Sequence, residues 1–436
     1  MLTRSAFTGT LLRSAISYQL DTATLRSYHL YGMPIDNVHA LNVFRDSLFN
    51  AQFLRFLGHT GAGGADIGEC YAAASSIREG DGESWYAGWH GLGERTESQA
   101  EASLGLGHTV SARLGLLKAS NYYHAAYLFM MQPKPDARLL AAYRAQRRAF
   151  EKATTLFPDW GRRIEIPFEQ RHLHGYYYPS QSPGPRPVLI VTGGYDSTAE
   201  EAYFFSGPAA LARGYHVVTY DGPGQGAELI ENGQVFRPDW ETVLRAVMAW
   251  VQQQPNVDST KIAQLGISFG GYLGPRAASG VEGLAATIAD PGQQSLLEEF
   301  RTRLPKFVAG QVPNGNKFLL MILERVMNRR MRHLTEGWAL RRGLWVHGVE
   351  TPLQYLKLTE QYVTDGSKIR CPILICSAEN DDIGQTADAL FSDVVSQKSR
   401  SYFTADEGAA GHCESLGRST FNMRAFDWLD QILKDA

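Results

Sequence analysis

The sequence lacks long apolar runs, and this absence excludes one class of protein. A transmembrane helix needs about 20 consecutive, mostly apolar residues, and no stretch of even about 18 occurs in the 436 residues. We therefore expect no membrane span.

Cysteine is scarce. The chain has four, namely Cys70, Cys371, Cys376 and Cys413. Their spacing lacks the close pairs typical of zinc or redox sites, and a chain of this length does not need disulfides to hold its core together. We predict free thiols, no metal site and a cytoplasmic protein.

A strong charge of either sign is also absent. The 42 lysine and arginine residues nearly balance 45 acidic residues, which gives a formal net charge of −3. Such a chain lacks the positive electrostatic potential that attracts the phosphate backbone of nucleic acids, so we do not expect it to bind nucleic acid. Hydrophobic residues make up 44% and charged residues 20%, which is typical of a globular protein.

The N-terminus allows two interpretations. Residues Met1 to Leu20 contain Arg4 and Arg13 and no acid before Asp21. Basic, hydroxyl-rich and acid-poor segments of this kind include transit peptides. We favour an ordinary N-terminal arm and keep the targeting segment as the alternative.

The first third of the chain has the texture of a helical protein. Its apolar residues recur at helical spacing, and no convincing strand occurs. We predict an N-terminal helical cap domain over residues 1–158. Its expected helices include 85–92, 98–117, 121–131 and one that Asp136 caps and that runs to about residue 155.

Short strands alternate with helices from residue 159 onward. Strands are expected at 164–168, 175–178, 187–192, 216–220, 262–268, 285–289, 371–377 and 401–404. The first two strands are predicted to form an antiparallel pair at the start of the sheet. The others predict an α/β fold with a doubly wound, mostly parallel sheet.

The alternation stops between the sixth and seventh of these strands. Residues 291–365 again have helical spacing. An insertion here would lie over the carboxyl edge of the strands, where such sheets bind ligands. We predict a helical lid over 291–365, inserted into an α/β core formed by 159–290 and 366–436.

The segment Gly266-Ile267-Ser268-Phe269-Gly270 is the most informative motif. It follows an apolar strand and precedes a small-residue helix, which is the context of a nucleophile elbow. Glycines on both sides let the strand and the helix pass closely, and the sharp turn lifts the serine hydroxyl out of the sheet. We predict that Ser268 is a nucleophile; the plain alternative is an ordinary strand–helix turn.

A serine nucleophile needs a base, and the base needs an acid behind it. His412 lies in a small-residue loop after the last predicted strand, and Asp381 and Asp382 follow the strand before it. The order serine, acid, histidine is the one this kind of sheet uses. We favour Asp381 and keep Asp382 as the alternative, because a one-residue error in the predicted strand end would exchange the two.

A second glycine-rich turn, Gly193 to Ser197, follows the first long parallel strand. An oxyanion needs two backbone N–H donors, and glycine lets the backbone approach the reacting carbonyl. The amide of Phe269 with that of Tyr195 or Gly194 is the expected pair.

Two other motifs point to weaker hypotheses. The turn Asp221 to Gly226 lacks the spacing of a dinucleotide-binding loop, and Pro223 removes an amide, so we expect a tight loop at the edge of the site and no cofactor. The arginines in the predicted lid indicate a solvated helix face or a feature that attracts an acidic substrate; they are Arg325, Arg329, Arg330 and Arg332.

Taken together, these motifs resemble the α/β-hydrolase superfamily. The branch most similar to the chain holds fungal polyketide-shortening hydrolases and bacterial 2,6-dihydroxypseudooxynicotine hydrolase, and Lys118 to Tyr123 resembles its helical region. The resemblance implies a triad of Ser268, Asp381 and His412, an N-terminal helical domain over the site, and cleavage of carbon–carbon bonds in β-dicarbonyl or acyl-phenol substrates. The link from Asp381 to Gln385 is shorter than is usual in that branch.

Three functions follow from these observations. The first is a cofactor-free serine hydrolase that cleaves a carbon–carbon or ester bond in a bulky, polyketide-like secondary metabolite. The second is a non-hydrolytic tailoring enzyme for ring closure, product release or acyl transfer, and the third is a binding protein with an inert elbow. The expected partner is a small molecule, and the oligomeric state, including a homodimer, stays open.

Overall fold

The computed structural model describes residues 43–130, 136–157 and 161–434. The predicted N-terminal arm over Met1 to Leu20 lies outside those residues and stays a prediction. Met131, the predicted end of a helix, also lies outside them, but residues 128–130 are not helical, so the predicted helix was too long.

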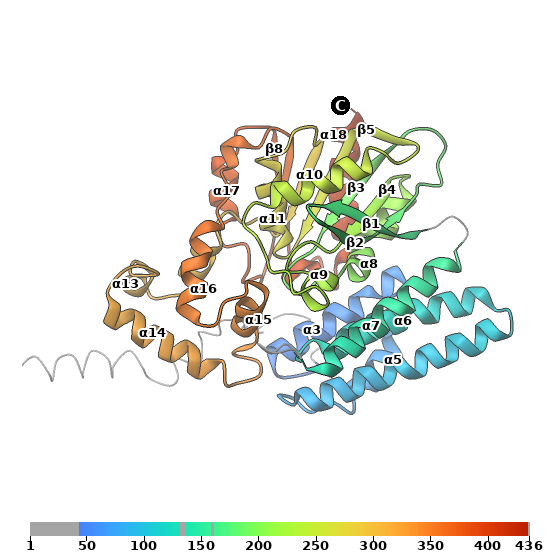
Figure 1. Ribbon diagram of the computed structural model, residues 1–436, viewed down its shortest axis with the longest axis horizontal. Coiled ribbons are helices and arrows are strands. Elements are labelled where there is room, and N and C mark those ends of the chain that lie inside the picture. The colour runs from blue at the N-terminus through green and yellow to red at the C-terminus, as the bar shows by residue number, and fades with distance from the viewer. Residues whose placement is uncertain (1–42, 131–135, 158–160, 435–436) are drawn as a thin grey trace, which may run out of the picture.

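Helices alone make up the N-terminal part of the described chain, as the spacing predicted. They are α3 (Ser47–Gly58), η1 (His59–Ala62), α4 (Ile67–Ala74), α5 (Gly82–Gly105), α6 (Thr109–Tyr127) and α7 (Ala137–Thr155). Figure 1 shows α5, α6 and α7 packed side by side below the sheet. Buried rings such as Phe53, Trp85 and Trp89 fill the space between the helices. Asp136 caps α7 as predicted, because its carboxylate accepts the N–H of Arg138.

The helix boundaries between residues 85 and 131 were predicted wrongly. The predicted break after residue 92 falls inside α5, and the predicted break after residue 117 falls inside α6. The true turn lies at Gly107, whose φ of 79° ends the helical path. Polar residues and glycines lower helix propensity, but they occur in the middle of these helices. Gly93, for example, lies against the ring of Tyr123, and this packing between α5 and α6 keeps the helix intact.

A sheet of eight strands forms the centre of the molecule. The strands are β1 (Arg162–Phe168), β2 (Arg171–Tyr178), β3 (Arg186–Thr192), β4 (His216–Tyr220), β5 (Val257–Ile267), β6 (Ala286–Asp290), β7 (Ile373–Ala378) and β8 (Lys398–Phe403). Their order is β1-β2-β4-β3-β5-β6-β7-β8. β2 pairs antiparallel with both β1 and β4, and all other neighbours are parallel. This confirms the predicted doubly wound, mostly parallel sheet.

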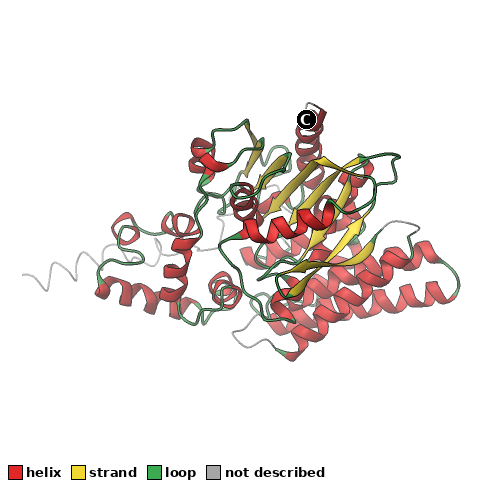
Figure 2. Ribbon diagram, turned by 45° about the horizontal axis from the view of Figure 1, so that its top comes forward, coloured by secondary structure: helices red, strands yellow, loops and turns green. Residues whose placement is uncertain are grey.

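Both faces of the sheet are covered by helices, as Figure 2 shows. These helices are α8 (Ala199–Ala212), α9 (Gly226–Ile230), α10 (Trp240–Val251), α11 (Gly270–Ala278), α17 (Ala387–Asp393) and α18 (Arg418–Lys434). Successive strand residues point to opposite faces. In β3, Leu189 and Val191 therefore pack in the cluster shared with α8 and α18, while Val188 and Ile190 pack in the one shared with α10 and α11.

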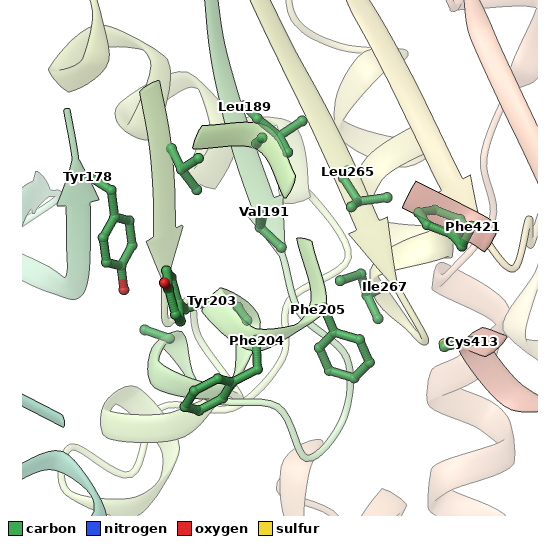
Figure 3. Close-up of a cluster of buried hydrophobic side chains, with 14 of the residues drawn as sticks. Tyr178, Leu189, Val191, Tyr203, Phe204, Phe205, Leu265, Ile267, Cys413 and Phe421 are labelled. Atoms are coloured by element: carbon green, nitrogen blue, oxygen red, sulfur yellow. The ribbon is translucent and has the colours of Figure 1, made fainter. Parts of the chain in front are cut away.

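The first of these clusters reaches the carboxyl edge of the sheet. Figure 3 shows Phe204 and Phe205 of α8 close to the lower ends of the strands, with Ile267 and Cys413 beside them. The four cysteines are all buried and free, which confirms the predicted free thiols.

Residues between β6 and β7 form helices, as predicted for the insertion. They are α12 (Leu296–Arg301), α13 (Lys306–Ala309), α14 (Lys317–Arg330), α15 (Trp338–Val346), α16 (Pro352–Leu358), η2 (Thr359–Gln361) and η3 (Gly366–Lys368). Trp338 of α15 is buried among the rings of the N-terminal helices and donates its indole N–H to the Leu128 carbonyl at 3.1 Å. The two helical parts of the chain therefore meet. In the three described ranges, no helix is both long enough and apolar enough to cross a membrane.

Candidate active site

Ser268 lies at the tight turn between β5 and α11. Its φ is 60°, in the left-handed region that residues with a Cβ rarely adopt. The turn closes because Gly266 lies against α11: a Cβ at this position would be 2.0 Å from the Gly270 carbonyl oxygen. Two bonds fix the serine backbone, since its N–H donates to the Asp290 carbonyl at 2.7 Å and its carbonyl accepts from Gln293 Nε2 at 2.7 Å.

The side chains of Ser268, His412 and Asp381 form one hydrogen-bonded row. Ser268 Oγ is 2.8 Å from His412 Nε2. On the other side of the ring, His412 Nδ1 lies 3.0 Å from Asp381 Oδ2 and 3.2 Å from Oδ1. The three residues follow β5, β8 and β7, so parallel strands bring together groups that lie up to 144 residues apart. This is the arrangement in which an imidazole removes a hydroxyl proton.

Asp382 lies away from that row. It is exposed, and its carbonyl oxygen accepts a bond from Arg303 Nη2 at 2.8 Å. The carboxylate of Asp381 is nearly buried, with 3% of its side chain exposed. Of the two alternatives left by the sequence, Asp381 is therefore the one in contact with His412.

The surroundings of His412 favour its charged form. Burial by itself would lower the pKa of the imidazole, but the Asp381 carboxylate offsets this through its charge and its hydrogen bond, and the net pKa is raised. The neighbouring Asp290 and Asp196 act in the same direction. An imidazolium that forms during a reaction is thereby stabilised.

A carboxylate from the insertion holds the loop that carries Asp381. Glu299 of α12 accepts the backbone N–H groups of Gly384, Gln385 and Thr386 at 3.2, 3.1 and 2.7 Å, and the Thr386 hydroxyl at 2.7 Å. Burial raises the pKa of Glu299, and the bonds from Thr386 and Gln385 oppose the rise. The sequence did not indicate Glu299, because no local pattern marks a contact between segments more than 80 residues apart.

The turn after β3 lies directly beside the serine. A Cβ on Gly194 would be 2.7 Å from Ser268 Cβ and 3.0 Å from the Phe269 nitrogen, so only glycine fits there. The Gly194 N–H already donates to Ser197 Oγ at 2.9 Å. Since an N–H makes one strong bond, this favours Tyr195 over Gly194 as the second oxyanion donor. In the part of the chain that the structure describes, the Phe269 N–H has no acceptor.

The loop of Asp221 to Gly226 supports the same turn. Gln225 Nε2 donates to the Gly193 carbonyl at 2.6 Å and to the Gly194 carbonyl at 3.3 Å. Asp221 is buried, and its carboxylate accepts the N–H groups of Ala199 and Ala227 at 2.7 and 2.8 Å. Burial, together with the charge of Glu200, raises the pKa of Asp221 to about 7. These residues support the turn beside Ser268. The sequence indicated a tight loop at the edge of the site but not the bonds that it makes.

A cavity of about 270 Å³ opens above the serine. Its floor contains Ser268, His412 and Asp381, and α3 forms one wall. The apolar part of the lining consists of Leu48, Ala51, Leu54, Phe205, Ile267, Trp338, Ile383, Ala405, Ala410 and Leu416. Arg55 of α3 also reaches the cavity, where it bonds Asp196 at 2.6 Å and both oxygens of Glu201 at 2.6 and 2.7 Å.

The arginines singled out in the insertion lie elsewhere. Arg325 and Arg329 are exposed on α14, Arg332 is exposed just after it, and Arg330 is half-buried. None of them lines the cavity. They form a solvated surface, as the first of the two interpretations predicted. Among the described residues, no three or more His, Cys, Asp or Glu side chains form a group that could hold a metal ion.

Comparison with known proteins gives a consistent picture. The model of the "Alpha/beta hydrolase family" matches residues 172–416. The chain is 36% identical over 353 residues to 20-hydroxy-prefusarin hydrolase of Gibberella moniliformis, covering 77% of this chain and 83% of that protein. It is 32% identical over 419 residues to the hydrolase acrC of Aspergillus aculeatus, covering 89% of this chain and 97% of that protein.

A solved structure shares the fold. The crystal structure of 2,6-dihydroxy-pseudo-oxynicotine hydrolase superposes with a TM-score of 0.69 at 22% identity, covering 86% of this chain and 95% of that one. The similarity therefore includes the helices before the sheet as well as the sheet itself.

Proposed function

This chain belongs to the alpha/beta hydrolase family and is an enzyme of the hydrolase type, and from that premise we propose that it is a serine hydrolase that works through an acyl-enzyme. Ser268 is the nucleophile, His412 the general base and acid, and Asp381 the acid that orients the imidazole. The observation that carries the proposal is the hydrogen-bonded row from Ser268 Oγ through His412 to Asp381 at the floor of the cavity.

The geometry suggests a sequence of proton transfers. His412 Nε2 takes the Ser268 proton as Oγ attacks the substrate carbonyl, and the N–H groups of Phe269 and Tyr195 stabilise the oxyanion. Collapse of the tetrahedral intermediate breaks the ester or carbon–carbon bond, and His412 returns its proton to the leaving alkoxide or enolate. Water, deprotonated by the same imidazole, then attacks the acyl-enzyme and releases a carboxylic acid and free Ser268.

The substrate proposed is a bulky, mostly apolar secondary metabolite of the polyketide type. The cavity wall is largely apolar, and residues of α3 and α15 contribute to its lining. A covered apolar cavity selects for ligands that lose water-exposed apolar surface on binding. The name of the relative in Gibberella, a hydrolase of 20-hydroxy-prefusarin, supports the same class.

An isotope experiment tests the proposed reaction. The protein is incubated with a panel of aryl esters and β-diketones in H₂¹⁸O, and the products are analysed by mass spectrometry. Hydrolysis is expected to cut the substrate into two fragments and to place one ¹⁸O in the acid product, since water enters only at the second step. Cleavage without ¹⁸O, or a product of unchanged or smaller mass in one piece, would reject hydrolysis in favour of acyl transfer or ring closure.

The raised pKa of His412 predicts the pH dependence. Only the neutral imidazole accepts the Ser268 proton, and the Asp381 carboxylate keeps the ring protonated to higher pH than the ordinary value of 6.5. We expect kcat/KM for p-nitrophenyl butyrate to fall as the pH is lowered, with an apparent pKa above 6.5. A profile that stays flat well below pH 6.5, or that rises toward acid, would contradict this role of the histidine.

A further inference from the structure

One buried cation of the insertion touches the turn beside the nucleophile. Arg342, in α15, donates from Nε and from Nη2 to the Tyr195 carbonyl at 2.8 and 2.6 Å. The two residues lie 147 positions apart, and Arg342 is only 4% exposed. Burial lowers the pKa of Arg342 to about 10, with the charge of Asp196 acting against the fall, so the guanidinium remains charged at neutral pH.

The bonds to Arg342 complete a set that fixes Tyr195 on both sides. A trans peptide is planar, with its C=O and N–H on opposite sides, so holding the carbonyl also sets the direction of the N–H. Gln225 holds the Gly194 carbonyl, and thus the plane that contains the Tyr195 N–H. Arg342 holds the next plane through the Tyr195 carbonyl.

The side chain of Tyr195 is held by the same part of the insertion. Its ring stacks on that of Phe269, with centroids 4.5 Å apart and planes 3° from parallel. Its hydroxyl lies 2.8 Å from Nε2 of His347, a residue that follows α15 directly. Burial lowers the pKa of His347 to about 3, so this imidazole is neutral. Tyr195 and Phe269, the two residues proposed to donate oxyanion N–H groups, are therefore in contact through their stacked rings.

The residue after Tyr195 is held by the N-terminal helices. His124 of α6 donates from Nε2 to the Asp196 carbonyl at 3.1 Å, and Arg55 of α3 pairs with the Asp196 carboxylate. These bonds act on Asp196, one residue beyond the oxyanion donor. Arg342 holds the carbonyl of Tyr195 itself.

We infer that Arg342 is a positioning residue that fixes the backbone of Tyr195 on its carbonyl side, so that its N–H, in the plane that Gln225 holds, stays directed at the oxyanion. The helical insertion then completes the catalytic site instead of only covering it. The inference rests on the proposed serine hydrolase mechanism. It assigns no contact between Arg342 and the substrate. A misdirected N–H would stabilise the oxyanion of the transition state less and would leave substrate binding in the ground state almost unchanged.

A neighbouring arginine supplies the matched control. Arg341 lies on the same helix, and its guanidinium donates to carbonyls within the insertion, at His333 and Leu334 over 2.9 and 2.6 Å. Burial lowers its pKa as well. Replacing it disturbs the insertion without removing a bond to the Tyr195 turn.

The experiment compares Arg342→Lys, Arg342→Met and Arg341→Met with the wild type. Turnover of p-nitrophenyl butyrate and the rate of labelling by a fluorophosphonate are both measured, because both reactions develop negative charge in the oxyanion hole. For Arg342→Met we expect kcat and the labelling rate to fall together by about 100-fold, with KM changed by less than about threefold. Arg342→Lys is expected to fall less, since an ammonium retains one donor. Arg341→Met is expected to keep both rates near those of the wild type.

Three results would overturn the inference. They are an unchanged kcat in a folded Arg342→Met variant, a loss that appears in KM instead of kcat, and an equal loss in Arg341→Met. Thermal unfolding identifies folded variants, and Arg342→Lys serves if Arg342→Met does not fold. The inference would be supported if added guanidinium chloride restored the turnover of Arg342→Ala and had no effect on Arg341→Ala. If wild type and Ser268→Ala label equally, the proposed mechanism fails, which is a different outcome from a failure of the Arg342 assignment.

Discussion

Replacement of Ser268 by alanine is expected to lower kcat by about five to six orders of magnitude, because the variant has no oxygen with which to attack the carbonyl. The expected residual rate is that of direct attack by water on the bound substrate, assisted by the oxyanion donors. Labelling by a fluorophosphonate should disappear completely. Turnover of an ester and labelling of the purified protein measure the two effects.

The fold should survive this substitution. Ser268 has a φ of 60°, and alanine carries the same Cβ as serine, so the strain of the turn does not increase. The thermal unfolding midpoint is expected to stay close to that of the wild type. Ser47→Ala is the control, since Ser47 lines the same cavity from α3 and lies outside the hydrogen-bonded row. Full turnover by Ser268→Ala would remove the nucleophile assignment.

Exchange of Asp381 for asparagine is expected to lower kcat by about 10⁴-fold, because an amide can donate to Nδ1 and so favour the wrong tautomer of the histidine. Asp381 also raises the pKa of His412, so the acid limb of the residual activity should move to lower pH. Steady-state rates across a pH series measure both effects.

Asp382→Asn is the matched control for this prediction. The change is chemically identical and lies one residue away, but Asp382 is exposed, and the carboxylate that lies beside His412 Nδ1 is that of Asp381. We expect near wild-type rates. A larger loss in Asp382→Asn than in Asp381→Asn would reverse the assignment of the acid.

Local patterns predicted the core of the fold well. The apolar run of β3 faces helices on both sides, which is why it is continuous instead of alternating. The parallel pairing of the later strands followed from the helices between them. The turn at Ser268 was equally readable, because a positive φ and a close strand–helix approach require particular residues within five positions.

The N-terminal helices were harder to delimit. Gly93 would end a solvent-exposed helix, yet it lies in the middle of α5, where the ring of Tyr123 packs against it. Glycine lowers helix propensity by about 1 kcal/mol, which packing between two long helices easily outweighs. A pattern within one helix contains no information about its neighbour.

The sequence by itself determined the chemistry at hand: a serine on a strained turn, a histidine and two acids after later strands, and glycines beside them. All of these depend on short windows, in which spacing and residue type dictate backbone conformation. The tertiary structure decided which acid touches His412, that Gly194 has already used its N–H, and that Glu299, Gln225 and Arg342 brace the loops of the site. Apart from the local Gly194–Ser197 bond, these contacts join segments from about 30 to almost 150 residues apart. Such pairs depend on how the chain folds back over the sheet.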